Sequence, residues 1–151
     1  MRRRLAALLL LSLVVAPRLA AQQAGGETEK EVLAALDRFF EGMTGRDTVL
    51  SRAVMLPGAR FYVPLEGRTR IQSDTAYIAS LTKGTSRLVE RIRNPTVLIR
   101  GDLAEVWTWY EFLIDDKRSH CGVDSFTFLR TESGWRMATA AYTIETTGCP
   151  E

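Results

Sequence analysis

The sequence has few of the residues that most often build metal sites and nucleophilic active sites. It contains one histidine, His120, and two cysteines, Cys121 and Cys149. It has no HExxH, GxSxG or CxxC motif and no glycine-rich phosphate-binding loop. His120 and Cys121 are neighbours on a predicted strand, so their side chains point to opposite faces and cannot form a catalytic pair unless a bulge intervenes. We therefore expect no metal site and no cofactor.

Long apolar runs are absent except at the N-terminus. Three arginines at residues 2–4 precede an apolar stretch over residues 5–16, and small residues follow at Ala20 and Ala21. This is the layout of a secretory signal peptide. As a helix, residues 5–16 would extend only ~18 Å, which is short of a bilayer core of ~30 Å. We predict a signal peptide over residues 1–21, export to the periplasm or the cell exterior, and no membrane span after cleavage.

A basic surface is also lacking once the signal is removed. The chain has 20 Lys and Arg residues and 18 Asp and Glu residues, but Arg2, Arg3, Arg4 and Arg18 belong to the signal. The remaining 16 basic residues against 18 acidic ones give a net charge of −2. No basic run remains, and we expect no nucleic-acid partner.

The remaining chain divides into a polar, glycine-containing segment at residues 22–27, predicted to be a flexible tether, and a domain over residues 28–149. Apolar residues at helical spacing predict a helix over residues 28–43. Asp47 is a candidate cap for a short second helix that Pro57 and Gly58 end, and Ser73 or Asp74 for a third. Strands are predicted at residues 60–63, 88–100, 103–114, 119–130 and 135–146, with an edge position or bulge at Pro95. This order predicts an α+β fold, with three N-terminal helices on a strongly curved antiparallel sheet.

The order of elements resembles the nuclear transport factor 2-like superfamily over about residues 28–147. The segments that carry the resemblance are DRFFEG at 37–42, GDLAEVW at 101–107, SHCGVD at 119–124 and GWRM at 134–137. The chain is most similar to the exported SnoaL-like or lumazine-binding-like branch. The resemblance implies a cone-shaped, cystatin-like domain with a pocket for hydrophobic small molecules, general acid–base chemistry in some members, and dimers formed through the sheet.

The strand faces give candidates for the pocket. His120, Asp124 and Phe126 share one face of their strand if the pairing is regular, and this face also carries Phe128. The alternative places Cys121 and its face inside and exposes His120. His120 and Asp124 are roughly 13 Å apart along a strand, so they could contact one ligand but could not form a dyad. The predicted pocket residues are Phe40, Tyr62, Tyr110, His120, Asp124 and Phe126.

Two further features have alternative interpretations. Trp107 and Trp109 lie on the second face of a central strand and indicate either a homodimer contact through the sheet or two exposed rings. Cys121 and Cys149 could form a disulfide after export, because Gly148 would let the C-terminal segment fold back. Such a bond would contribute roughly 3–4 kcal/mol. The alternative is a buried free Cys121 with Cys149 in a loose tail.

These observations favour an exported, non-catalytic domain that binds a small hydrophobic molecule in a cone-shaped pocket. A first alternative is an isomerase, dehydratase or cyclase that uses general acid–base groups in the same pocket. A second is an assembly module whose pocket is vestigial. Two or more ionisable groups converging in the cavity would favour catalysis. A mostly apolar cavity would favour binding alone.

Overall fold

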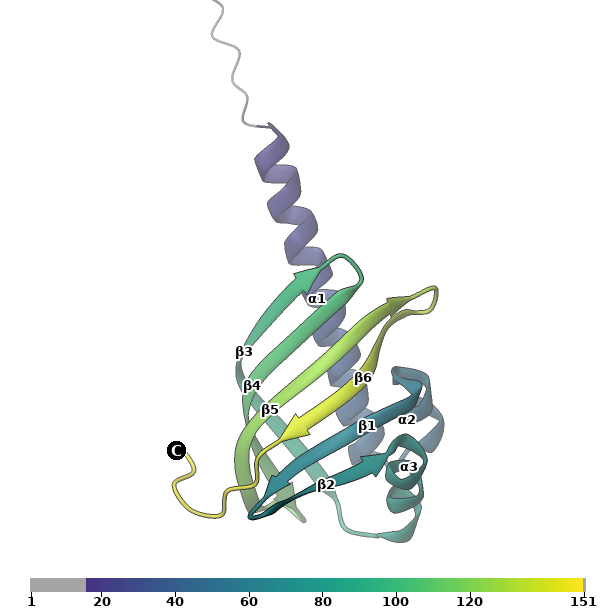
Figure 1. Ribbon diagram of the computed structural model, residues 1–151, viewed down its shortest axis with the longest axis vertical. Helices are drawn as coiled ribbons and strands as arrows, with labels where there is room; N and C mark the ends of the chain where they lie inside the picture. The colour runs from purple at the N-terminus through teal and green to yellow at the C-terminus, as the bar shows by residue number, and fades with distance from the viewer. Residues whose placement is uncertain (1–15, 151) are drawn as a thin grey trace, which may run out of the picture.

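Three helices and one six-stranded sheet make up the residues that the computed structural model describes, 16–150 (Figure 1). The strand order is β2-β1-β6-β5-β4-β3, and every neighbouring pair is antiparallel except β1 and β6. The predicted α+β class, with helices preceding a curved sheet, is therefore confirmed. The elements are α1 (Ala16–Thr44), α2 (Thr48–Val54), β1 (Met55–Leu65), β2 (Arg68–Ser73), α3 (Asp74–Lys83), β3 (Leu88–Arg100), β4 (Leu103–Ile114), β5 (Lys117–Thr131) and β6 (Gly134–Tyr142).

Helix α1 begins at Ala16, earlier than the predicted start at residue 28. Residues 22–27, predicted to be a flexible tether, are helical in the uncleaved chain, because Ala, Gln and Glu favour helix and only Gly25 and Gly26 oppose it. The predicted cleavage point after Ala21 lies within this helix. Residues 1–15 of the predicted signal lie outside the described residues, so the signal peptide stays a prediction.

The first half of the domain departs from the predicted boundaries. Asp47 caps α2 as expected, and its carboxylate accepts hydrogen bonds from the backbone N–H groups of Val49 and Leu50. The helix ends at Val54 rather than at Pro57, because strand β1 already pairs with β6 at Met55. Strand β2 was not predicted, since its sequence RTRIQS has no apolar alternation. It forms by antiparallel pairing with β1.

The second half follows the prediction closely. Strands β3 and β4 have the predicted bounds, β3 is an edge strand, and a register shift surrounds Asn94 and Pro95. Asn94 adopts a positive φ of 52°, so the bulge predicted from Pro95 is confirmed. On β5 the aromatic face is buried, with Phe126 and Phe128 almost fully enclosed, which decides between the two predicted orientations.

The core lies between α1 and the concave face of the sheet. Helix α1 packs against β3 and β6, and α3 packs against β1 and β2. The buried side of α1 supplies Val32, Leu36, Phe39, Phe40 and Met43, the apolar positions that predicted the helix. In Figure 1 α1 passes behind the sheet and α2 and α3 lie at its β1–β2 edge, so no helix covers the face toward the viewer. No helix in residues 16–150 is both long and apolar enough to cross a membrane.

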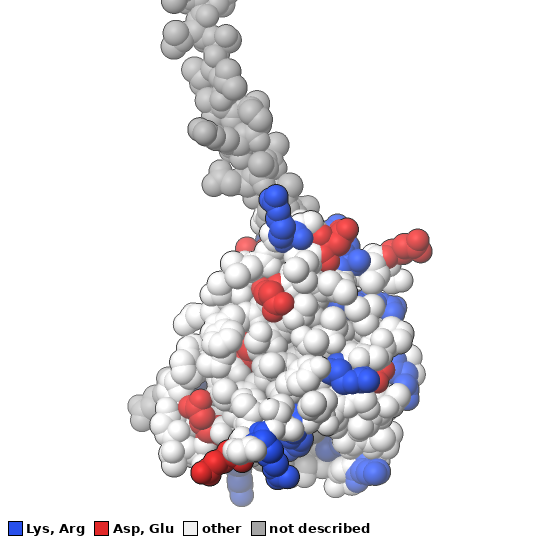
Figure 2. Space-filling model, viewed as in Figure 1, with Lys and Arg blue, Asp and Glu red and all other residues white. Residues whose placement is uncertain are grey.

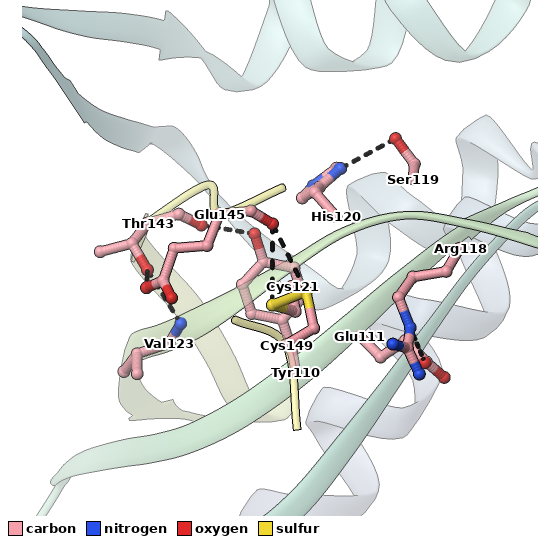
Figure 3. The surroundings of a disulfide bond; sticks show 10 residues. All are labelled: Tyr110, Glu111, Arg118, Ser119, His120, Cys121, Val123, Thr143, Glu145 and Cys149. Carbon is pink, nitrogen blue, oxygen red and sulfur yellow. Dashed lines mark hydrogen bonds and ion pairs between the residues drawn. A yellow bond between two sulfur atoms is a disulfide. The ribbon is translucent and has the colours of Figure 1, made fainter. Parts of the chain in front are cut away.

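A disulfide holds the C-terminal tail against β5. It joins Cys121 to Cys149 with a Cα–Cα distance of 5.7 Å, so the predicted pairing is confirmed (Figure 3). Gly148 has a φ of 74°, the left-handed conformation that lets the tail turn back. Cys121 and Glu145 also exchange both backbone hydrogen bonds. A disulfide is compatible with an exported protein.

Candidate functional site

A cavity of about 190 Å³ lies between α1, α3 and the concave face of the sheet. Its deep end is formed by buried apolar side chains, among them Phe39, Phe61 and Phe126. Partly exposed residues such as Leu88 and Phe112 surround the other end, which indicates the entrance. The lining residues are Phe39, Met43, Phe61, Gln72, Tyr77, Ser80, Leu81, Leu88, Glu90, Phe112, Asp124, Phe126, Ala140 and Tyr142.

Two carboxyl groups converge in this largely apolar cavity. Glu90 comes from β3 and Asp124 from β5, the two strands that flank β4. The two carboxyls lie close enough to interact directly, and because two adjacent buried carboxylates repel each other, the pair favours a state in which one of them is protonated. Neither forms an ion pair with any Lys or Arg in residues 16–150. The pair is therefore an acid–base couple, with Asp124 buried and Glu90 half-buried, and neither carboxyl belongs to a salt bridge among residues 16–150.

Burial makes this pair hold a proton at neutral pH. Loss of hydration raises the pKa of Asp124 to about 10, and the adjacent Glu90 carboxylate adds to that rise. Burial raises the pKa of Glu90 to about 7, against a smaller opposing effect of the hydrogen bond from Asp124. The two carboxyls thus lose their protons in separate steps, and the pair retains one proton at neutral pH.

Two polar atoms on the cavity wall have no hydrogen-bond partner among the described residues. They are Oδ2 of Asp124 and the hydroxyl oxygen of Tyr77. Buried polar atoms are nearly always paired, because an unpaired one loses its hydration without compensation. Burial also raises the pKa of Tyr77 well above its usual value, so its hydroxyl stays a neutral donor. These atoms could bond to an oxygen of a bound molecule.

Of the six predicted pocket residues, the structure places Asp124 and Phe126 on the cavity wall. The other four lie elsewhere. Phe40 packs behind the wall, with its ring edge-on to Phe126 at 6.0 Å between centroids. Tyr62 points to the opposite face of β1, because the alternation buries its neighbour Phe61 instead. The binding role of all six stays a prediction.

Tyr110 and His120 belong to the cluster around the disulfide. The Tyr110 hydroxyl donates to the carbonyl of Thr143, so it is not available to a ligand (Figure 3). The His120 ring stacks on Phe112, with 4.8 Å between the ring centroids. Phe112 lines the cavity, whereas His120 is not among the lining residues. Burial, with a smaller effect of the nearby Arg70, lowers the pKa of His120 and keeps it neutral.

Sequence reasoning missed Glu90, although a signal was present. Leu88, Glu90 and Ile92 alternate with outward-facing residues, so a period of two places Glu90 on the buried face of its strand. A carboxylate between two inward apolar residues is a candidate functional group. Tyr77 lies among the buried apolar positions of α3, beside Ile78 and Leu81, so its hydroxyl gave no separate signal in the sequence. Residues 16–150 contain no cluster of three or more His, Cys, Asp or Glu side chains that could hold a metal ion.

Comparisons with solved structures identify the fold. An NTF2-like protein with a cystatin-like fold from Novosphingobium aromaticivorans superposes with a TM-score of 0.70 and 18% identity, covering 91% of this chain and 94% of that one. An NTF2-like protein of unknown function from Silicibacter pomeroyi gives 0.64 and 21%, with 80% and 98% covered. An NTF2-like superfamily protein from Salmonella enterica gives 0.66 and 15%, with 83% and 96% covered.

The chain therefore has the nuclear transport factor 2-like fold that its sequence resembles. No family model matches the sequence, and no curated protein matches it. The structural neighbours do not distinguish the SnoaL-like branch from others, so that finer assignment stays a prediction.

Proposed function

We propose that this domain, with its nuclear transport factor 2-like fold, binds a small, mainly apolar carbonyl compound and transfers a proton on it. The observation that carries the proposal is the pair Glu90 and Asp124, two carboxyls that converge in an apolar cavity without a cationic partner among the described residues. General acid–base catalysis commonly uses two titratable groups whose surroundings give them different pKa values, so that one acts as the acid and the other as the base. The non-catalytic interpretation favoured by the sequence is thus the alternative.

Each carboxyl has a defined role in this mechanism. Glu90, as the carboxylate, removes a proton from the carbon next to the carbonyl, and the C–H electron pair becomes the C=C bond of an enol. Asp124, as the acid, donates its proton to the carbonyl oxygen, with Tyr77 as a second donor. Glu90 then delivers a proton to the same carbon, or to a conjugated one, while the enol oxygen returns its proton to Asp124 and the carbonyl re-forms, which completes an exchange or an isomerisation. The two residues finish in their starting states.

The size of the cavity limits the ligand. A cavity of ~150 Å³ accommodates one benzene molecule. A cavity of about 190 Å³ therefore holds one six-membered ring with a small substituent, and larger ligands would extend past Leu88 and Phe112 toward solvent. The apolar deep end excludes strongly hydrated ligands, because they would lose water without compensation.

Hydrogen–deuterium exchange into cyclohexanone tests the proposal. The folded domain is incubated with the ketone in D₂O near neutral pH, and NMR follows loss of the α-hydrogen signal while saturation-transfer difference spectra report binding. We expect exchange faster than in buffer, and loss of about 100-fold or more of the rate in Glu90→Gln and Asp124→Asn. Glu105→Gln is the matched control, since it removes a carboxylate on β4 that bonds Thr127 instead.

Two results would contradict the proposal in different ways. Binding of cyclohexanone with exchange no faster than in buffer would leave a binding domain without proton transfer. If cyclohexanone, phenol and benzoate all failed to bind, the inference that the cavity is a ligand-binding pocket would itself be wrong.

Assembly through the outer face of the sheet is a second candidate function, favoured by a separate observation. Trp107 and Trp109 on β4 are 57% and 44% exposed, and further exposed leucines lie on the same strand (Leu103) and on its neighbours β3 (Leu98) and β5 (Leu129). Figure 2 views this side and shows charged side chains mostly toward its margins. We infer a homodimer contact here, because monomers rarely expose contiguous apolar areas of this kind. A monomer in sedimentation experiments at high protein concentration would contradict it.

We also infer that the domain acts after export, in the periplasm or outside the cell. The signal layout of residues 1–21 and the Cys121–Cys149 disulfide support this. N-terminal sequencing of protein recovered from the native host should begin at Gln22. A mature protein that retains residues 1–21 in the cytoplasm would contradict it.

A further inference from the structure

Arg70 lies at the edge of the cavity without a carboxylate partner. It is two residues before the cavity residue Gln72 on β2, and the alternation of the strand turns both toward the same face. Its Nη2 donates to the hydroxyl of Tyr142 over 3.4 Å, and Tyr142 itself lines the cavity. No ion pair joins Arg70 to a carboxylate in residues 16–150.

Several other arginines of the domain have carbonyl or carboxylate partners, whereas neither kind of partner is found for Arg70 among residues 16–150. Arg46 donates to the backbone carbonyls of Leu81 and Ser86. Five more arginines form ion pairs with Asp or Glu side chains, namely Arg60, Arg87, Arg91, Arg118 and Arg130. The phenol of Tyr142 occupies one guanidinium nitrogen of Arg70 but cannot balance its charge. Most donors of this guanidinium are therefore free to bind an anion.

We propose that Arg70 binds a carboxylate of the ligand and selects ring-bearing acids over their neutral analogues. This inference rests on the proposed function, because it takes the cavity to be the ligand site. The guanidinium fork matches a carboxylate with two parallel hydrogen bonds. Burial lowers the pKa of His120 and raises the pKa of Tyr142, so neither of these neighbours of Arg70 supplies a negative charge that would compete with the ligand.

The position of Arg70 also separates two charges that would repel each other. The Glu90–Asp124 pair lies inside the cavity and carries the negative charge of its ionised member. A carboxylate on Arg70 stays at the exposed rim, where it keeps part of its hydration, while the ring enters the apolar cavity. The ligand class is thus a single-ring carboxylic acid with its acid group directed outward. A second polar group of such a ligand, such as a carbonyl, would reach the pair.

Benzoate and benzamide are the probes for this test, since they have nearly the same shape and differ in charge. Binding of each to the disulfide-bonded domain is measured by ligand-observed NMR titration at neutral pH and low salt. We expect benzoate to bind about 10-fold more tightly than benzamide. Arg70→Gln should remove this preference and leave benzamide binding unchanged. Arg70→Lys should keep part of it, because the charge stays and the fork is lost.

Arg68→Gln is the matched control, because it removes the same charge from the same strand, two residues nearer the β1–β2 turn. It should leave the preference for benzoate intact. Equal binding of both probes to the native protein would overturn the role of Arg70 while leaving the pocket in place. If Arg68→Gln and Arg70→Gln lost the preference for benzoate to the same extent, overall charge would explain that preference, and this would also overturn the role of Arg70. Failure of both probes while cyclohexanone binds would overturn the role of Arg70, and failure of cyclohexanone as well would instead overturn the proposed function.

Discussion

Strand β5 carries two neighbouring regions of opposite character. Around Cys121, polar groups are matched: the Tyr110 hydroxyl donates to the Thr143 carbonyl, and the Thr143 hydroxyl accepts from the backbone N–H of Val123 (Figure 3). Around Asp124, only three residues further along, a carboxyl oxygen is buried without a partner among the described residues. The matched region stabilises the fold, and the unmatched region is what a ligand can complete.

The largest effect should come from breaking the matched region at its disulfide. Cys149→Ser removes a bond across a 28-residue separation and should lower the free energy of unfolding by roughly 3–4 kcal/mol. Urea denaturation without reductant measures this loss. The native protein under reducing conditions should lose a similar amount. Equal stability of the oxidised native protein and the variant would show that the tail contributes nothing.

The next effect concerns the hydroxyl that anchors the tail. Tyr110→Phe leaves the Thr143 carbonyl without its donor and should cost about 1–2 kcal/mol of unfolding free energy. Tyr62→Phe is the matched control, because it removes the same hydroxyl from a residue of β1 that faces away from the cavity. It should change the free energy of unfolding by less than about 0.5 kcal/mol. If the two variants behaved alike, the matched region would have no special role.

In the unmatched region the same kind of change should act in the opposite direction. Asp124→Asn removes a buried group that resists ionisation and should raise the unfolding free energy at neutral pH by about 1 kcal/mol. It should abolish proton exchange at the same time. A strong loss of stability in this variant would mean that Asp124 supports the fold rather than the reaction.

The sequence predicted the matched region better than the unmatched one. The bounds of β3 and β4 followed from local patterns, because alternation and turn residues act over short distances. The pairing of Cys121 with Cys149 followed instead from the predicted export, the presence of only two cysteines in the sequence and the turn that Gly148 allows. The Glu90–Asp124 contact joins β3 to β5 across β4, and no local pattern specifies which side chains meet over a curved sheet. The prediction that Tyr62 lines the pocket was wrong for a simpler reason. Neighbouring residues of a strand point to opposite faces, and it is Phe61 rather than Tyr62 that faces the cavity.

The smallest expected effect is a pH dependence of stability that arises from Asp124 in the unmatched region. The pKa of Asp124 is raised in the folded state, so the folded protein binds this proton more tightly than the unfolded chain. Its stabilising contribution is complete below the unfolded pKa near 4 and is lost as pH rises through neutrality toward the folded pKa of about 10. The advantage of Asp124→Asn over the native protein should therefore grow from pH 4 upward. Thermal denaturation across pH 4–9 measures it, and a constant difference would contradict the raised pKa.

The shared proton of Glu90 and Asp124 is tested most directly by carboxyl ¹³C NMR titration of the folded protein. Glu90→Gln and Asp124→Asn assign the two resonances. We predict that one carboxyl of the pair stays protonated above pH 7, while the other titrates well above the usual range. If both carboxyls instead titrated near pH 4, the pair would be ionised at neutral pH, and the cavity would have no acid to support proton transfer.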